Sequence, residues 1–481
     1  MPESQVQPIS LRNHANGVIL ESSVDEFLLP EGSVSYSLNF NYDKIGSATV
    51  RPGYLVLGDQ MNAGSTVVGL HNFLDEGAGT DDRLIAVVDT VVYYLSGSTW
   101  TSKRTSLTAD AKADFTSFVD QVFMVNGQEA SAVWSGASGD SFVTNANALS
   151  APVGNFVENF RSRVWIANTA ANPSRLTYSS VASSSGTILW SGSDFGFIDV
   201  APGDGEDITG IKKFSNALLV FKKNFTYRVF SVNETDPDPK IFVGTYSNES
   251  IELGKDGVYF HHPSGIFRMT GNGAPVEISK PINNIIENVV ASYYTEVSSW
   301  HDSDHVYFSL GDVTMEGQTV TNCVVRWTIS TEVWAVYSYA DEFHIGASYD
   351  NGTNIVQVVG GEDGYVYTFN SGASDNGAAI NYHLETKYYT FSGLRSETKT
   401  IRRLSALHTE LTGAQLGWKN GNHSFSEIQP IGTMQKQEQV FDNQDVKGNR
   451  IKFVVSGASA VQTGSFQGLE ILEWINEGVI D

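Results

Sequence analysis

Hydrophobic residues in this chain occur either in short uninterrupted runs or in alternation with polar residues, and glycine, asparagine, aspartate and serine separate these segments. The run Leu84–Val88, for example, is followed by Asp89 and Thr90 and then by a second run, Val91–Leu95. Short apolar runs bounded by turn-forming residues are typical of β-strands. Because the pattern continues almost from end to end, we predict an all-β protein.

Paired segments of this kind recur, each with a short polar turn between two strands. They lie at Leu84–Leu95, Gln121–Asn126, Arg163–Ser179, Ala217–Phe230, Gly257–Met269, His305–Leu310 with Val324–Ile329, and Ile355–Phe369. Successive pairs are about 40 to 50 residues apart, which is the length of a four-stranded propeller blade. We therefore predict a β-propeller over residues 66–377 with about seven blades, six to eight being compatible with the spacing. A set of separate β-sandwiches is the alternative.

One segment departs from the strand pattern. After Pro281 the apolar residues are spaced three and four positions apart, at Ile282, Ile285, Ile286, Val289 and Val290. This spacing places them on one face of a helix. Proline suits the first helical turn because its missing N–H costs no hydrogen bond there. We predict one short amphipathic helix that packs on a sheet, with Ser279 or Lys280 at its cap.

The two ends of the chain differ from this array. Residues 1–65 contain two strand-like segments, Tyr36–Tyr42 and Ala48–Val56, and we predict an extended N-terminal arm with a hairpin. Residues 378–481 contain longer strand-like segments, which predict a compact C-terminal β-sandwich-like module. The glycine-, serine- and asparagine-rich segment Ser371–Gly377 predicts a linker between the propeller and this module.

The charge of the chain is strongly acidic, with 54 acidic and 30 basic residues and a net charge of −24. Nucleic-acid-binding proteins concentrate lysine and arginine, so this composition argues against a surface that grips phosphates. Residues 1–380 carry −23 of the charge and residues 381–481 only −1. A near-neutral module is easier to bury between proteins. We therefore predict that the arm and the C-terminal module join neighbouring subunits, and that the propeller projects outward. The alternative is that both ends only close the propeller's own sheet.

Other features narrow the class of protein. The longest apolar runs, such as Ala217–Phe221, fall far short of the roughly 20 residues that a membrane span needs, so we expect no membrane partner. The single cysteine, Cys323, excludes an internal disulfide and a zinc cluster built on cysteine. The first residues, Met1–Gln5, lack the charged start and apolar stretch of a signal peptide.

The search for catalytic or metal-binding patterns predicts no enzymatic activity, no cofactor and no metal. The neighbours His261 and His262 face opposite sides of a strand and cannot easily share an ion. Asp302 and His305 are typical of a polar turn. The aromatic residues most available for a sugar platform are expected to pack in the interior instead; they are Tyr293, Tyr294, Trp300, Trp327, Trp334, Tyr337 and Tyr339.

A resemblance to a known family rests on three segments. The first, Gly271–Asn288, reads GNGAPVEISKPINNIIEN, and it is followed by Trp300–Leu310 and by the tryptophan-bearing segment Val325–Val336. This succession of turn, proline-started helix, hydrophobic strand and hairpin resembles the tail nozzle, or packaged-DNA stabilisation, proteins of short-tailed bacteriophages. Leu29–Ser33 together with Arg51–Tyr54 is similar to the leading segment of such proteins, and Ile208–Ser231 is similar to their mid-array hairpin.

The resemblance implies a structural virion protein with a β-propeller and added β domains. Its copies would form a homo-oligomeric ring, a hexamer, that extends the tail tube below the portal, seals the genome and conducts it during ejection. The implied partners are the adaptor or head-to-tail connector proteins, tail needle or fibre proteins, and double-stranded DNA that passes through the lumen without specific binding. The implied location is the virion tail, assembled in the cytoplasm of the bacterial host.

An acidic lumen would suit such a conduit, because it repels phosphates and leaves the duplex few contacts to break. The channel-facing candidates, which we place in or near loops, are Asp236, Asp238, Glu249 and Glu252. Two alternatives remain open: a carbohydrate-binding or carbohydrate-active β-propeller, and another phage tail or receptor-binding component.

Overall fold

The computed structural model describes residues 8–20, 25–44, 46–74, 82–145, 147–234, 241–391, 397–421, 427–461 and 463–478. Strands account for 51% of the residues and helices for 4%, so the predicted all-β class is confirmed. The strands form many small sheets in which almost all neighbouring strands are antiparallel.

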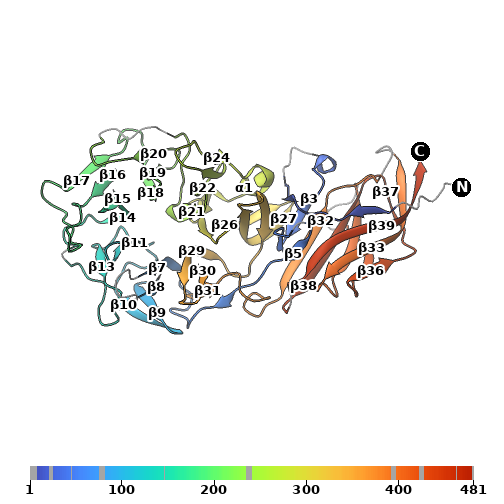
Figure 1. Ribbon diagram of the computed structural model, residues 1–481, viewed down its shortest axis with the longest axis horizontal. Coiled ribbons are helices and arrows are strands. Elements are labelled where there is room, and N and C mark those ends of the chain that lie inside the picture. The colour runs from blue at the N-terminus through green and yellow to red at the C-terminus, as the bar shows by residue number, and fades with distance from the viewer. Residues whose placement is uncertain are drawn as a thin grey trace.

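Seven sheets of three or four strands follow one another between residues 55 and 368 of the described chain, and together we call them the sheet array (Figure 1). The first sheet contains β7 (Val67–Phe73), β8 (Arg83–Val88), β9 (Val91–Ser96) and β10 (Thr99–Arg104). The second contains β11 (Asp114–Ser117), β12 (Val122–Val125) and β13 (Ala132–Trp134). The third contains β14 (Gly154–Phe160), β15 (Arg163–Thr169), β16 (Asn172–Tyr178) and β17 (Gly196–Asp199). The fourth and fifth are β18 (Ile208–Phe214), β19 (Ala217–Lys222) and β20 (Thr226–Val229); and β21 (Glu252–Gly254), β22 (Gly257–His262), β23 (Gly265–Met269) and β24 (Val276–Glu277). The last two are β25 (Ser298–His301), β26 (His305–Met315), β27 (Gln318–Thr328) and β28 (Val333–Tyr337); and β29 (Phe343–Asp350), β30 (Ile355–Gly361), β31 (Val366–Thr368) and β6 (Leu55–Val56).

The strands of each sheet pair with their neighbours in chain order, apart from β6 in the seventh sheet. The hairpins predicted at Leu84–Leu95, Ala217–Phe230, Gly257–Met269 and Ile355–Phe369 are therefore confirmed. The sequence revealed them because the second strand of a sheet is buried on both faces. Such a strand forms a continuous apolar run rather than an alternating one.

Neighbouring sheets of the array stack face to face. On β8, Ile85 shares a buried cluster with Val122 of the second sheet, whereas the adjacent Leu84 shares another with Val358 of the seventh. Further clusters join the second sheet to the third, the third to the fourth and the fourth to the fifth. The two faces of each of these sheets thus contact different neighbours.

The first strands of the sheets also pack against one another. The contacts lie between β7 and β11, β11 and β14, β14 and β18, β21 and β25, β25 and β29, and β29 and β7. The seventh sheet is completed by β6, which precedes the first sheet in the chain. Leu55 pairs there with Thr368, and Val56 pairs with Tyr367.

Two larger sheets share one hydrophobic core and form what we call the two-sheet module, at the right of Figure 1. One sheet contains β2 (Gly17–Val18), β3 (Ser33–Leu38), β32 (Ile380–Thr386), β38 (Ile451–Ser459), β34 (Gln415–Asn420) and β35 (Gln429–Thr433). The other contains β36 (Glu438–Phe441), β33 (Thr398–Thr409), β39 (Ser465–Gly478), β5 (Ala48–Val50) and β4 (Phe40–Asn41), with β1 (Ile9–Leu11) on β39 and β37 (Val446–Gly448) on β33.

The N-terminal segment differs from the extended arm that the sequence predicted. The hairpin is present, since Phe40 pairs with Val50, but the strands of this segment are built into three sheets. β3 pairs with β32, β5 pairs with β39, and β6 belongs to the seventh sheet of the array. The described part of residues 1–65 is therefore shared between the module and the array.

The predicted linker Ser371–Gly377 is tied to this N-terminal segment by hydrogen bonds. The backbone N–H of Ser371 donates to the carbonyl of Gly53, and Asp375 receives two hydrogen bonds from the Arg51 guanidinium, at 2.8 and 2.7 Å. Arg51 also donates to Asn39 and lies over the ring of Tyr339, 3.8 Å from its centre. The connection between array and module is thus a built joint rather than a loose linker.

A second joint lies further along the hairpin. The guanidinium of Arg326, on β27, donates to both carboxylate oxygens of Asp43, at 3.0 and 2.5 Å. Arg326 is buried, and the hydroxyl of Tyr337 donates to Asn41 beside it. Because each joint combines a charge pair with neutral hydrogen bonds, both fix direction as well as distance.

Helical structure is confined to short pieces. They are η1 (Glu26–Leu28), η2 (Asn248–Ser250), η3 (Lys280–Ile282), α1 (Asn283–Ile286) and η4 (Ala291–Tyr293). The predicted helix is confirmed as η3 and α1, with Pro281 in the first turn and Ser279 at the cap position. The helix ends at Ile286, earlier than the spacing predicted; Ile282, Ile285, Ile286 and Val289 are buried, whereas Val290 is exposed.

Candidate functional site

A cavity of about 410 Å³ lies among the first strands of the second, third and fourth sheets and the short helix η2. A smaller cavity of about 100 Å³ adjoins it and shares Asp114, Asn248 and Glu249 with it. The first strand β11 positions Asp114, and the short helix η2 positions Asn248 and Glu249. Both cavities are therefore built from residues of one chain.

Charged groups of both signs line the larger cavity. The ammonium of Lys112 lies 3.0 Å from a carboxylate oxygen of Glu296 and also donates to the carbonyl of Thr295. Burial raises the pKa of Glu249, and the positive charge of Lys112 partly offsets that effect. Lys112 therefore balances two carboxylates at this side of the cavity.

Asp114 has the most unusual environment of the lining residues. Its side chain accepts hydrogen bonds from the backbone N–H of Val157, at 2.8 Å, and of Phe115, at 3.0 Å. Burial, and then the neighbouring Glu249 carboxylate, raise the pKa of Asp114 from 3.8 to about 8. Asp114 consequently holds its proton at neutral pH and can donate a hydrogen bond.

Glu252 lies in the smaller cavity and makes an ion pair with His301 at 2.9 Å. The hydrogen bond to Glu252 raises the pKa of His301. Burial alone would raise the pKa of Glu252, but His301 and Lys212 lower it. Burial alone would lower the pKa of Lys212, but Glu252 and other nearby carboxylates raise it. Glu252 and Lys212 thus stabilise each other in their charged forms.

Neutral polar and aromatic side chains complete the larger cavity. The aromatic rings are those of Phe156 and Tyr246. The amide side chains are Asn126, Gln128, Asn155, Asn168 and Asn248. The cavity therefore offers hydrogen-bond donors, acceptors and apolar ring faces together, which is a typical composition of a small-ligand site.

The four acidic residues predicted from the sequence have different outcomes. Glu249 and Glu252 line the cavities within the sheet array, and their assignment to a channel between copies stays a prediction. Asp236 and Asp238 lie outside the described residues. The sequence analysis missed Asp114, because nothing in its local sequence distinguishes it; only the structure places it at the start of β11.

The other patterns considered in the sequence are mostly structural. Asp302 accepts hydrogen bonds from the backbone N–H groups of Asp304 and His305, as expected of a polar turn. His261 is fully buried, whereas His262 contacts the hydroxyl of Ser264. Most of the aromatic group is interior packing, as predicted; Trp300, Trp327, Trp334, Tyr337 and Tyr339 are all buried.

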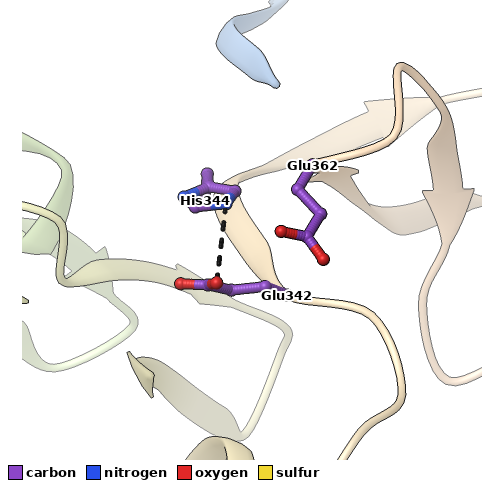
Figure 2. Close-up of side chains that lie close together, drawn as sticks. All are labelled: Glu342, His344 and Glu362. Atoms are coloured by element: carbon purple, nitrogen blue, oxygen red, sulfur yellow. Dashed lines mark ion pairs between the residues drawn. The ribbon is translucent and has the colours of Figure 1, made fainter. Parts of the chain in front are cut away.

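One group outside the cavities has the donor atoms of a metal site: Glu342, His344 and Glu362 (Figure 2). Their potential ligand atoms lie within 4.8 Å of one another, and His344 Nε2 is 4.0 Å from Glu342 Oε2. Imidazole and carboxylate ligands suit Zn²⁺ or Mn²⁺. Two ligands with bonds of about 2.1 Å to one ion lie at most about 4.2 Å apart, so the separation between His344 and Glu342 is compatible with a shared ion, although Glu362 is exposed to solvent.

Comparisons with known proteins identify no family. No protein-family model matches the chain, and no curated protein matches it. One solved structure, that of the computationally designed Ika8 protein, aligns with a TM-score of 0.40 and 11% identity over 66% of this chain and 99% of that chain. A similarity at this level carries no conclusion about this protein. None of the described helices is long and apolar enough to cross a membrane.

Proposed function

We propose that this chain is a structural virion protein of a short-tailed bacteriophage, a ring-forming tail nozzle below the portal and adaptor. In this proposal the sheet array is a seven-bladed β-propeller and the two-sheet module is a β-sandwich. The nozzle retains the packaged DNA and conducts it during ejection. The proposal includes a ring of six copies, contacts with adaptor and with needle or fibre proteins, and a place in the virion tail.

Three features of the array support the propeller. Neighbouring sheets stack face to face, and their first strands contact one another. The seventh sheet is completed by β6, a strand that precedes the first sheet in the chain. This is a common way to close a ring of blades. Two of the seven sheets have three strands rather than four.

The observation that carries the nozzle proposal is the fixed attachment of the array to the module. Arg51 pairs with Asp375 between the two segments that connect the parts, and Arg326 of β27 pairs with Asp43 of the hairpin. Both are two-point ion pairs, and both arginines are buried. A subunit of a tube that contains DNA under pressure must keep its shape. Buried, geometrically specific joints supply that rigidity, whereas a flexible linker would not.

The charge of the chain is compatible with a DNA conduit. A net charge of −24 makes the surface repel phosphates, so that a sliding duplex meets few favourable contacts. The cavities inside the array are far too small for a duplex, so in this proposal the DNA passes between copies rather than through one chain.

Electron microscopy of purified particles that contain this chain tests the proposal. We expect a ring of copies at the end of the portal and adaptor, with an acidic lumen. A single copy per particle, a fibre trimer, or a lumen lined mainly by lysine and arginine would contradict it. Native mass spectrometry of the purified chain, with and without its docking partner, measures the number of copies independently.

A further inference from the structure

We propose that the 410 Å³ cavity in the sheet array binds a neutral, polyhydroxylated small molecule, a mono- or disaccharide unit. This inference rests on the lining of the cavity and does not depend on the role in a phage tail. The volume lies within the range of about 300 to 1,000 Å³ that small-ligand pockets occupy.

The charges in the cavity favour a neutral ligand. An anion such as phosphate would meet Glu249 and Asp207, and a polyamine would meet Lys112 and Lys223. Lys112 is already paired with Glu296, and the Lys223 ammonium lies over the ring of Tyr246, so both cations of the lining already have a partner within the chain. A neutral ligand avoids both repulsions, and its hydroxyl groups can hydrogen-bond to either kind of side chain.

Several polar atoms of the lining are available to such hydroxyl groups. The side-chain amides of Asn155 and Asn168 donate to backbone carbonyls, and within the described chain their carbonyl oxygens receive no hydrogen bond. The hydroxyl groups of a bound ligand can donate to these two carbonyl oxygens.

The two aromatic residues supply apolar contacts. Phe156 on β14 and Tyr246 ahead of η2 both line the cavity and are only partly buried. A sugar ring has apolar C–H faces between its hydroxyl groups, and a ring of this kind fits against an aromatic side chain. Polar groups that fix orientation beside aromatic groups that supply contact area are the usual composition of such pockets.

Saturation-transfer NMR on the full chain tests the proposal with three neutral probes: methyl α-D-glucopyranoside, D-galactose and N-acetyl-D-glucosamine. Methyl phosphate and spermidine serve as charged comparison probes, because both have carbon-bound protons that the experiment detects. We expect saturation transfer to at least one neutral sugar and none to the charged probes. Transfer to methyl phosphate or spermidine alone, or to no probe, would overturn the proposal.

Two variants locate the binding. Ala111→Trp places a bulky side chain in the lining without removing a polar group, and we expect it to abolish the sugar signal. Tyr246→Ala removes one aromatic contact, and we expect it to raise Kd about tenfold. Phe242→Ala, at an aromatic residue that is 82% exposed outside the cavity, is the matched control and should leave Kd unchanged.

Circular dichroism confirms that each variant is folded. If Ala111→Trp does not fold, Tyr246→Ala and the Phe242→Ala control decide the location by themselves. A sugar signal that is unchanged in folded Ala111→Trp, or equal losses in Tyr246→Ala and Phe242→Ala, would show that the sugar binds elsewhere and would refute the proposed site.

Discussion

Arg51 and Asp375 lie far apart in the sequence and form a buried, two-point ion pair at the joint between the sheet array and the two-sheet module. All five N–H groups of the Arg51 guanidinium donate hydrogen bonds. Two donate to Asp375, and one each donates to Asn39, Pro52 and Ser338. An arginine so completely paired fixes the positions of several backbone segments at once.

Replacing Asp375 by asparagine should therefore be strongly destabilising. It leaves the Arg51 charge buried without its counter-charge, and we expect a loss of about 3 to 5 kcal/mol in the free energy of unfolding. Urea unfolding measures this loss. Asp445→Asn removes the partner of Arg402 in an exposed pair, where the side chains are 43% and 74% exposed, and should cost at most about 1 kcal/mol. Equal effects of the two substitutions would contradict the role of the joint.

Deletion of residues 378–481 should leave a chain that aggregates. β3 would lose its partner β32, and β5 would lose β39, so two strand edges and their apolar residues would be exposed. Val34 and Phe40, which are fully buried in the intact chain, would contact water. Size-exclusion chromatography measures the outcome. A monodisperse fragment with native-like circular dichroism would show instead that the array is stable without the module.

Asp114→Asn should change how stability depends on pH. The raised pKa of about 8 means that the folded state keeps a proton that the unfolded state loses above about pH 4. Stability therefore falls as the pH rises between these values, by up to about 1.4 kcal/mol per pH unit. Asparagine removes this dependence. The free energy of unfolding of the variant, relative to that of the wild type, should therefore increase from about pH 5 to pH 8. Urea unfolding across that range checks it, and parallel curves would refute it.

His261→Leu should change the stability of the protein mainly at acidic pH. Burial lowers the pKa of His261 from 6.5 to about 3, and neither ring nitrogen has a hydrogen-bond partner among the described residues. Below about pH 6.5 this histidine binds a proton in the unfolded state but stays neutral in the folded state. The free energy of unfolding therefore falls as the pH decreases. Leucine should reduce this acid sensitivity and add about 1 kcal/mol near neutral pH. Thermal melts at about pH 5 and pH 7.5 compare the two proteins, and unchanged acid sensitivity would count against the prediction.

Removal of metal ions should leave the fold unchanged. In the group of described residues that has suitable donor atoms, His344 already lies against Glu342, and the carboxylate of Glu362 is exposed to water, so the fold there does not depend on an ion. We expect the melting temperature to be the same with and without a chelator. A drop on chelation that Glu362→Gln abolishes would show that these residues form a metal site after all.

The sequence predicted the strands well where burial imposes a local pattern. Leu84–Val88 and Ala217–Phe221 are continuous apolar runs because they are second strands covered on both faces. Pro281 marked the start of the short helix for a similar local reason. What the sequence did not predict is the pairing of β3 with β32, since partners so distant leave no signal in either segment.

The candidate site was only partly predictable for the same reason. Glu249 and Glu252 were identified from the sequence as acidic residues near loops. Their position in a cavity depends on which strands lie at the centre of the array. Asp114 has an ordinary sequence context. Its raised pKa arises from burial where β11 packs against β14 and from the nearby Glu249 carboxylate, whereas the hydrogen bond from the Val157 N–H lowers it.

The pairing of β6 with β31 has a consequence for how the protein is made. Leu55 and Val56 leave the ribosome before any other strand of the array, but their partners Tyr367 and Thr368 are synthesised only after the six preceding sheets. At a synthesis rate of about 5 to 20 residues per second, the wait is roughly 15 to 60 seconds. During that time the seventh sheet is incomplete, and the growing chain must avoid pairing this strand with the wrong neighbour. The strand that completes the array is therefore synthesised first and paired last.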